Sequence, residues 1–183
     1  TWTIDLFTPY NKKNPYVLTC GDYIWLTHTE EEKCLSYGCI STRRVVYLNE
    51  NLSDTNGLWM IESLNKAAGG LVNVKETYRL KHVSTGRYLY LKKDEFEDKL
   101  VFRLKLTRNR CDDERANWSF VPLSGESEFI QSDEVCLLKN AENEVTISGR
   151  VDLKSGVYFQ TYIEEPNYFK FSRADGQVVL ETL

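Results

Sequence analysis

Histidine is the side chain used most often for acid–base catalysis near neutral pH and for binding metal ions, and this chain has two, His28 and His82. Shifting the segment around His82 back by 54 positions brings it onto the segment around His28. Shifting it forward by 58 positions puts Asn140 in the place of the histidine. Because the rings occupy equivalent places in a repeat, and a common zinc triad needs a third histidine, we expect them to hydrogen-bond the turns that follow them.

The other reactive side chains do not form a recognisable catalytic set. The five cysteines are an odd number, contain no Cys-x-x-Cys pair and match no common zinc spacing, so we expect reduced and mostly buried thiols. Ser84–Gly86 is typical of a turn, and Gly69–Gly70 lacks the Lys-Ser/Thr that completes a phosphate-binding loop. We therefore expect neither enzymatic activity nor a cofactor or metal.

Charge and hydropathy narrow the classes of partner. The chain has 183 residues, with 23 basic and 27 acidic side chains and a net charge of −4, whereas a general nucleic-acid binder usually carries a basic excess. Apolar runs stay far below the ~20 residues that span a bilayer, so this domain itself is not expected in the membrane. Partner contacts are instead expected from Trp25 and from a basic segment that includes Arg108 and Arg110.

Both of these interaction candidates have a plainer interpretation. Trp25 is flanked by Ile24 and Leu26, which share the opposite face of a strand, but its ring could equally pack against the next strand. The basic segment is followed at once by Asp112–Glu114, which would make it a self-neutralising surface loop.

The pattern of apolar residues is that of an all-β protein. Short runs rich in Val, Tyr, Phe, Trp and Leu recur about every ten residues between Gly, Asn, Asp and Ser clusters. The repeat that relates the histidine segments continues in two further sets of positions: Tyr47, Phe102 and Tyr158, and the pairs Trp59/Ile61, Trp118/Phe120 and Phe169/Phe171. Three copies of a four-stranded unit of about 55 residues predict a β-trefoil of three pseudo-repeats and about twelve strands.

The beginning of the chain adds one strand-like segment to this pattern. Trp2–Phe7 is a fourth copy of the aromatic-x-apolar strand, and a polar stretch with Pro9 and Pro15 follows it. Residues 1–14 are therefore interpreted either as the end strand of a preceding trefoil with its linker, or as the closing strand of this trefoil. Residues 15–183 are expected to form the trefoil itself.

Four motifs in one order resemble a known family: GDYIWLTHTEEEKCL, GLWMIE, the Gly69–Gly70 pair and YRLKHVSTGRYLYL. They are similar to the MIR-type second N-terminal β-trefoil of intracellular calcium-release channels, the inositol trisphosphate and ryanodine receptors. Trp2–Phe7 resembles the strand that ends the first trefoil of those channels. The resemblance is strong over residues 1–92 and weak, but in register, over residues 93–183. It implies a regulatory and ligand-gating module on the cytosolic face of the endoplasmic or sarcoplasmic reticulum membrane, in contact with neighbouring domains and subunits of a tetrameric channel.

The resemblance also implies where a ligand would bind. In the inositol trisphosphate receptors two places contribute basic residues to a site for three phosphates: the first hairpin, and the loop after the strand that here is Val45–Leu48. Lys33 matches a ligand-contacting lysine of that site, but Trp25 stands where the family has an arginine. The loop reads Asn49–Ser53, followed by Asp54, where the family has Arg-Thr-Thr-Gly-Arg. Tight binding of inositol trisphosphate by the usual residues is therefore not expected.

The basic candidates that remain for an inositol phosphate are Lys33, Arg43 and Arg44. The segment Arg43–Tyr47 resembles the ryanodine-receptor version, which does not use this ligand, so both branches stay open. The main alternative is a MIR protein of the secretory pathway, related to mannosyltransferases, that recognises protein or glycan. Glycosylation sequons at Asn51 and Asn117 are compatible with it.

Overall fold

The structure is a computed structural model that describes residues 17–29, 32–40, 42–51, 54–64, 69–96, 99–107, 114–125, 127–132, 134–142, 151–152, 156–160 and 169–173. For residues 94–101 and 151–173 only the backbone is described. Within these ranges no helix has the length and apolar character needed to cross a membrane.

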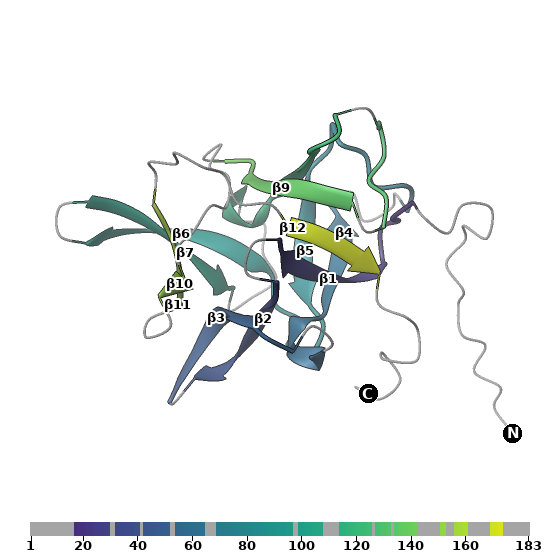
Figure 1. Ribbon diagram of the computed structural model, residues 1–183. Coiled ribbons are helices and arrows are strands. Elements are labelled where there is room, and N and C mark those ends of the chain that lie inside the picture. Colours follow the sequence, from purple (N-terminus) through teal and green to yellow (C-terminus); the bar gives the residue numbers. More distant parts are fainter. Residues whose placement is uncertain are drawn as a thin grey trace, which may run out of the picture.

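The described chain consists of twelve strands and two single turns of 3₁₀-helix, arranged as three units of four strands (Figure 1). The first unit has β1 (Tyr23–His28), β2 (Lys33–Ile40), β3 (Arg43–Asn49) and β4 (Trp59–Ser63). The second has β5 (Tyr78–His82), β6 (Leu89–Phe96), β7 (Lys99–Leu106) and β8 (Trp118–Pro122). The third has β9 (Glu134–Asn140), β10 (Val151–Asp152), β11 (Gly156–Gln160) and β12 (Phe169–Arg173). The turns are η1 (Thr55–Gly57), before β4, and η2 (Glu114–Ala116), before β8.

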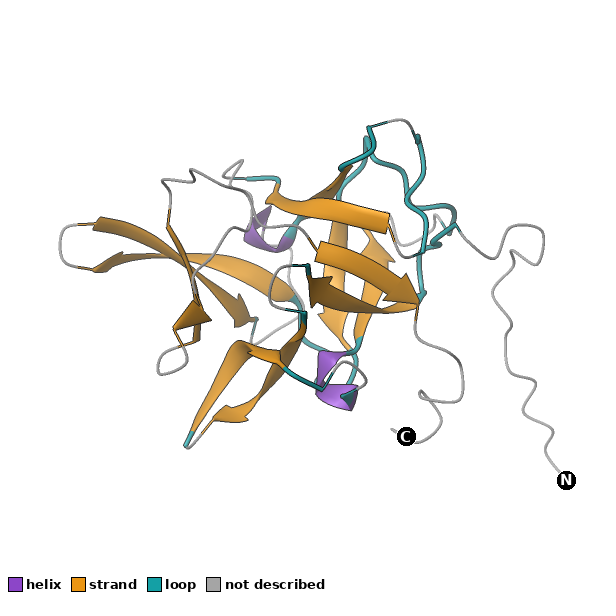
Figure 2. Cartoon of the chain, viewed as in Figure 1, coloured by secondary structure: helices purple, strands orange, loops and turns teal. Residues whose placement is uncertain are grey.

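The first and last strands of the three units form a closed barrel. Going around it, β1 pairs with β4, β4 with β5, β5 with β8, β8 with β9, β9 with β12, and β12 with β1, all antiparallel. The middle strands of each unit form the hairpins β2–β3, β6–β7 and β10–β11, which lie on the same side of the barrel (Figure 2). The predicted β-trefoil with three pseudo-repeats is confirmed.

The pseudo-threefold axis is marked by a ring of backbone hydrogen bonds. Leu18 N donates to Ile130 O at 2.8 Å, Ile130 N donates to Val72 O at 2.9 Å, and Val72 N donates to Leu18 O at 2.9 Å. All three side chains are fully buried. The ring satisfies backbone groups that burial would otherwise leave without partners, and it ties the three units together where they meet.

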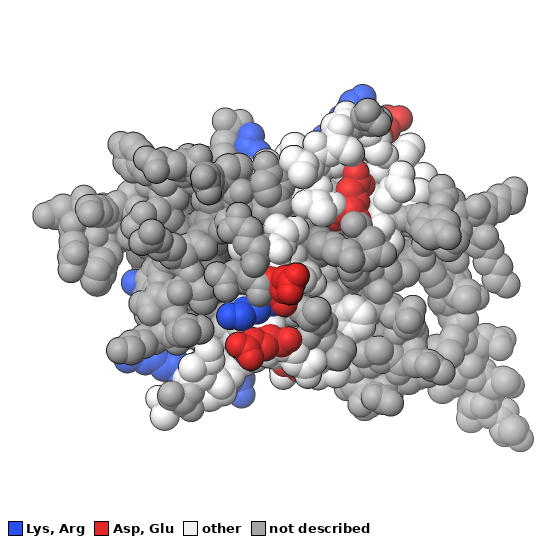
Figure 3. Space-filling view, viewed as in Figure 1, with Lys and Arg blue, Asp and Glu red and all other residues white. Residues whose placement is uncertain are grey.

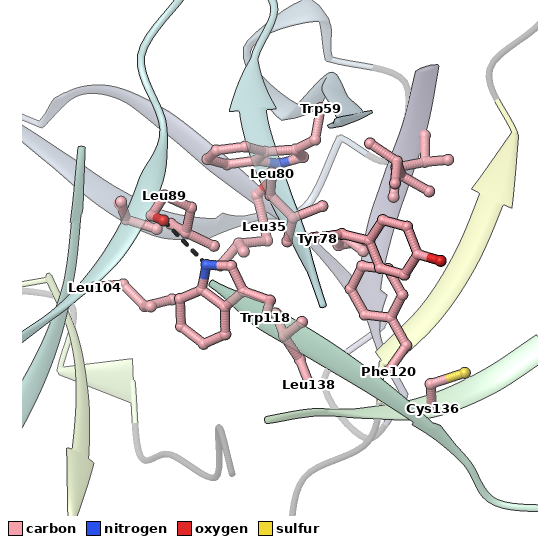
Figure 4. Packing of buried hydrophobic residues seen from close by; sticks show 14 of the residues in the cluster. Leu35, Trp59, Tyr78, Leu80, Leu89, Leu104, Trp118, Phe120, Cys136 and Leu138 are labelled. Atoms are coloured by element: carbon pink, nitrogen blue, oxygen red, sulfur yellow. Dashed lines mark hydrogen bonds between the residues drawn. The ribbon is translucent and has the colours of Figure 1, made fainter. Parts of the chain in front are cut away.

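Large rings from the barrel strands fill the core (Figure 4). Trp59 and Trp118 occupy equivalent places on β4 and β8 and are fully buried. The indole nitrogen of Trp59 donates to Leu35 O at 2.8 Å, and that of Trp118 donates to Leu89 O at 3.0 Å. Each bond joins the barrel to the hairpin of its own unit, so the same contact fixes both hairpins against the core.

The closing strand of the barrel is β12, which pairs with both β1 and β9. Trp2–Phe7, for which two interpretations were left open, lies outside the described residues. Its assignment to a preceding trefoil or to this one stays a prediction, as does the division of the chain at residue 14.

Candidate functional site

The hairpin β2–β3 carries the three predicted ligand contacts, but it does not bring them together. Lys33 begins β2 at the base of the hairpin, where it is opposite His28 of β1. Arg43 and Arg44 are exposed at the other end, opposite Ile40 and Cys39. Six to seven residues of extended strand separate the two ends, which corresponds to about 20 Å. Lys33 and the pair Arg43 and Arg44 therefore cannot bind the same small ligand at the same time.

Lys33 already lies beside a carboxylate. Its Nζ atom is 3.9 Å from Oε1 of Glu50, in the loop after β3, and the Glu50 side chain is 88% exposed. Such a pair contributes little to stability because water screens it. It does offset the positive charge at the position where the resemblance places a phosphate contact.

The loop after β3 is organised around the carboxylate of Asp54. This side chain caps η1, because Oδ1 accepts a hydrogen bond of 3.0 Å from Asn56 N, and it accepts a second one of 3.2 Å from Asn56 Nδ2. Oδ2 accepts from the side-chain amide of Asn49, and Asn49 Oδ1 accepts from Asn51 N at 3.1 Å. Three amide donors, from Asn49 and Asn56, thus bond the carboxylate of Asp54, and an incoming phosphate would meet negative charge there.

Trp25 lies on β1 in a half-buried position and packs close to η1. Gly57 approaches it so closely that a Cβ atom at this glycine would lie 3.5 Å from Trp25 Cδ1 and 2.7 Å from Cys34 Sγ. The indole nitrogen is buried, and no hydrogen-bond partner for it lies within the described residues. Both interpretations of Trp25, as an interface anchor and as a ring packed against the next strand, stay predictions.

The other predicted interaction residues, Arg108 and Arg110, lie outside the described residues. The basic segment that leads to them is visible on β7, where the half-buried Arg103 and Lys105 alternate with buried apolar residues. On the face of the molecule shown in Figure 3, the described Lys and Arg side chains are scattered, and some lie next to acidic ones. That face has no continuous basic surface among its described residues.

His82 has the structural role that the repeat predicts. Its Nε2 atom lies 2.9 Å from Asn56 O in η1, and its Nδ1 atom lies 3.0 Å from Thr85 Oγ1 in the turn that follows β5. A carbonyl oxygen can only accept, so Nε2 carries the proton and Nδ1 accepts from Thr85. Burial lowers the pKa of His82 below 6.5, although the bond to the Asn56 carbonyl opposes this shift. The ring is therefore neutral at physiological pH.

The same corner recurs one repeat later with a different side chain. Asn140 is fully buried, and its Nδ2 atom donates to Arg115 O at 2.9 Å. Arg115 is the middle residue of η2, as Asn56 is of η1. Sequence reasoning aligned Asn140 with His82 but did not identify the two carbonyl partners, although the similar spacing of the two turns was a signal for them.

Two of the described cysteines, Cys34 and Cys136, are buried thiols. The structure describes four of the five cysteines, and no disulfide joins them. Burial raises the pKa of Cys34 to about 12 and also raises that of Cys136, so both stay protonated and unreactive. Among the described residues, no group of three or more His, Cys, Asp or Glu side chains could hold a metal ion.

The sequence and the fold were then compared with known proteins. Residues 16–162 match the family described as MIR domain. The fold is similar to that of an SDF2-like protein from Arabidopsis thaliana, with a TM-score of 0.62 and 15% identity over 86% of this chain and 88% of that one. It is also similar to a Caenorhabditis elegans protein of unknown function, with a TM-score of 0.69 and 15% identity over 88% of this chain and 98% of that one. At such identity these two likenesses concern the fold alone.

Proposed function

Because this chain belongs to the MIR domain family, we propose that it is a regulatory interaction module of an intracellular calcium-release channel, placed on the cytosolic face of the reticulum membrane. In this role it passes on the state of a ligand or partner through contacts with neighbouring domains and subunits. A closed barrel suits such a task, since it moves as a rigid body. The order of the motifs between residues 21 and 91, which resembles the second N-terminal trefoil of these channels, supports the placement.

The observation that supports a mode of action through protein contacts is the loop around Asp54. In the loop after β3 the described carboxylates are Asp54 and Glu50, and Lys33 is the basic side chain beside Glu50, whereas Arg43 and Arg44 lie at the far end of the hairpin. The loop after β3 lacks both arginines that the family's ligand site has there, and each charge-assisted hydrogen bond is worth about 1.5–3 kcal/mol. Their loss lowers affinity by several hundred-fold or more. We therefore infer that the module works through protein contacts, without inositol trisphosphate held in the usual way.

One observation favours the alternative, a MIR protein of the secretory pathway. Asn51 is exposed in the loop after β3, where a glycan could be attached without disturbing the barrel. The second sequon is less suitable, because Asn117 is half-buried and its carbonyl accepts from Ala141 N at 2.9 Å, next to the buried Trp118. An occupied Asn51 would place the module in the lumen.

Protease protection of microsomes separates the two functions. The full-length protein that contains this chain is expressed in eukaryotic cells with an epitope tag beside the module, and intact microsomes are treated with protease with and without detergent. The proposal predicts digestion without detergent and no mass shift after glycosidase treatment. Protection of the tag until detergent is added, together with a glycosidase shift that Asn51→Gln removes, would contradict the channel function and support the luminal one.

A further inference from the structure

Two walls of the barrel occupy equivalent places and have the same register, but their outer faces differ. On the β4–β5 wall the outward pair is Glu62 opposite Arg79. Glu62 accepts from the hydroxyl of Tyr88 at 2.8 Å and lies 3.8 Å from Lys81 Nζ, and the guanidinium of Arg79 lies 5.8 Å from the centre of the Tyr88 ring. This wall is covered by its own charged and aromatic side chains.

On the β8–β9 wall the corresponding pair is Val121 opposite Leu137. The apolar stripe continues to Leu123, whose backbone N donates to Val135 O at 2.9 Å and so extends the ladder beyond β8. Val121 is 41% exposed and Leu123 is 61% exposed, which makes Leu123 the most exposed of the large apolar side chains described. We call these four residues, Val121, Leu123, Val135 and Leu137, the apolar wall. Val135 and Leu137 are half-buried, so the exposed part of the wall is Val121 and Leu123, and adjacent exposed apolar side chains of this kind mark a contact surface.

The start of the described chain lies next to this wall. Val17 forms a bridge with Gln131, and Gln131 N donates to Glu134 Oε2 at 2.8 Å, one residue before Val135. Upstream of Val17, nine residues connect it to Trp2–Phe7 and can span up to about 30 Å. Trp2, Ile4 and Leu6 alternate with polar residues, so an extended segment would present them on one face.

We propose that Trp2–Phe7 docks in cis on the apolar wall, with Trp2, Ile4 and Leu6 against Val121, Leu123 and their neighbours. The segment then covers the barrel from outside and is not one of its strands, because β12 already pairs with both β1 and β9. The contact couples the apolar wall to whatever the chain connects to before residue 2. The proposal takes the place of both earlier interpretations of Trp2–Phe7, and it does not rest on the proposed channel function.

The test follows Trp2 by fluorine NMR in the full chain of 183 residues labelled with 5-fluorotryptophan. Trp2→Phe assigns its signal among the four tryptophans, and a soluble paramagnetic agent reports its exposure. A synthetic peptide of residues 1–10 gives the value for full exposure. The test variant is Leu123→Glu, which puts a carboxylate in the contact and should weaken docking by about tenfold or more. The matched control is Leu64→Glu, at the equivalent position after β4, where Leu64 is 38% exposed.

The proposal predicts that Trp2 is protected in the native chain and in Leu64→Glu, and that Leu123→Glu exposes it nearly as fully as in the peptide. Since Leu123 is on the surface, its substitution should leave the signals of Trp59 and Trp118 unchanged, which verifies the fold. Full exposure of Trp2 in the native chain would overturn the proposal, and so would protection that survives Leu123→Glu. Protection that increases with protein concentration would mean that a second copy supplies the segment, and would overturn docking in cis.

Discussion

The corners at η1 and η2 do the same structural task with different side chains. In one, the ring of His82 donates to Asn56 O, and in the other the amide of Asn140 donates to Arg115 O. The contacts of Trp59 and Trp118 with the hairpins are, in contrast, almost identical. The comparison teaches that each of these two corners uses a buried side-chain donor, while the type of residue that supplies it can differ. Only the histidine corner adds a response to pH.

The largest losses of stability should come from substituting the tryptophan that the first and the second unit each place in the core. Trp59→Ala and Trp118→Ala each remove a fully buried indole and leave a cavity, so each should lower the free energy of unfolding by about 3–5 kcal/mol. Urea denaturation followed by circular dichroism measures both. If one variant loses far less stability than the other, the two units do not contribute equally to one core.

Next in size are substitutions that break one corner. His82→Ala removes a fully buried ring and leaves the carbonyl of Asn56 without its donor, which should cost about 1–3 kcal/mol. His82→Asn should recover much of this loss, because Asn140 shows that an asparagine amide reaches the equivalent carbonyl. The same denaturation experiment compares the two variants. Equal losses for alanine and asparagine would contradict the equivalence of the corners.

Acid should weaken the histidine corner alone. Burial lowers the pKa of His82 in the folded state below the value of 6.5 for an exposed histidine, so the unfolded chain binds more protons between these two values. Stability from this corner is complete above pH 6.5 and is lost as the pH falls from there through the folded-state pKa. The difference in stability between the native chain and His82→Asn, measured by urea denaturation between pH 7.5 and 5, should therefore shrink with acid. A difference that stays constant would show that His82 does not titrate in this way.

The smallest effect is expected on the charged β4–β5 wall. Glu62→Gln removes the partly exposed ion pair with Lys81 and weakens the bond from Tyr88, for a loss of about 0.5–1 kcal/mol that high salt reduces. The conservative change Val121→Ala on the apolar wall should show no such dependence on salt. Thermal denaturation at low and high ionic strength measures how the stability loss of each variant depends on salt. An equal dependence in both variants would contradict the claim that charged pairs stabilise the β4–β5 wall and not the β8–β9 wall.

The fold was predictable because its repeat is carried by large buried residues. The spacing of 54 and 58 residues that aligns His82 with His28 and Asn140 also relates Val72 to Leu18 and Ile130, the residues of the backbone ring. Such residues repeat because equivalent places in a closed barrel have the same space to fill. The twelve strands and their grouping in three units follow from this.

For the hairpin β2–β3 and the loop that follows it, the sequence predicted which types of residue are present but not how they are arranged. The loss of basic residues after β3 is plain in the sequence, but the way in which Asp54 turns back to Asn49 and Asn56 depends on local geometry. The separation of Lys33 from Arg43 follows from the register of the hairpin, which residue types alone do not fix. The apolar wall went unnoticed because an exposed Leu123 and a buried leucine look alike in a sequence.

The central claim is that the module acts through protein contacts and does not hold inositol trisphosphate at the first hairpin. Calorimetric titration of inositol 1,4,5-trisphosphate tests this most directly, with this chain and with a longer protein that includes the following domain of the full-length product. The account predicts no heat of binding from either, with both shown to be folded by circular dichroism. Binding to the longer protein with a Kd of about 1 µM or tighter, abolished by Lys33→Ala, would contradict it.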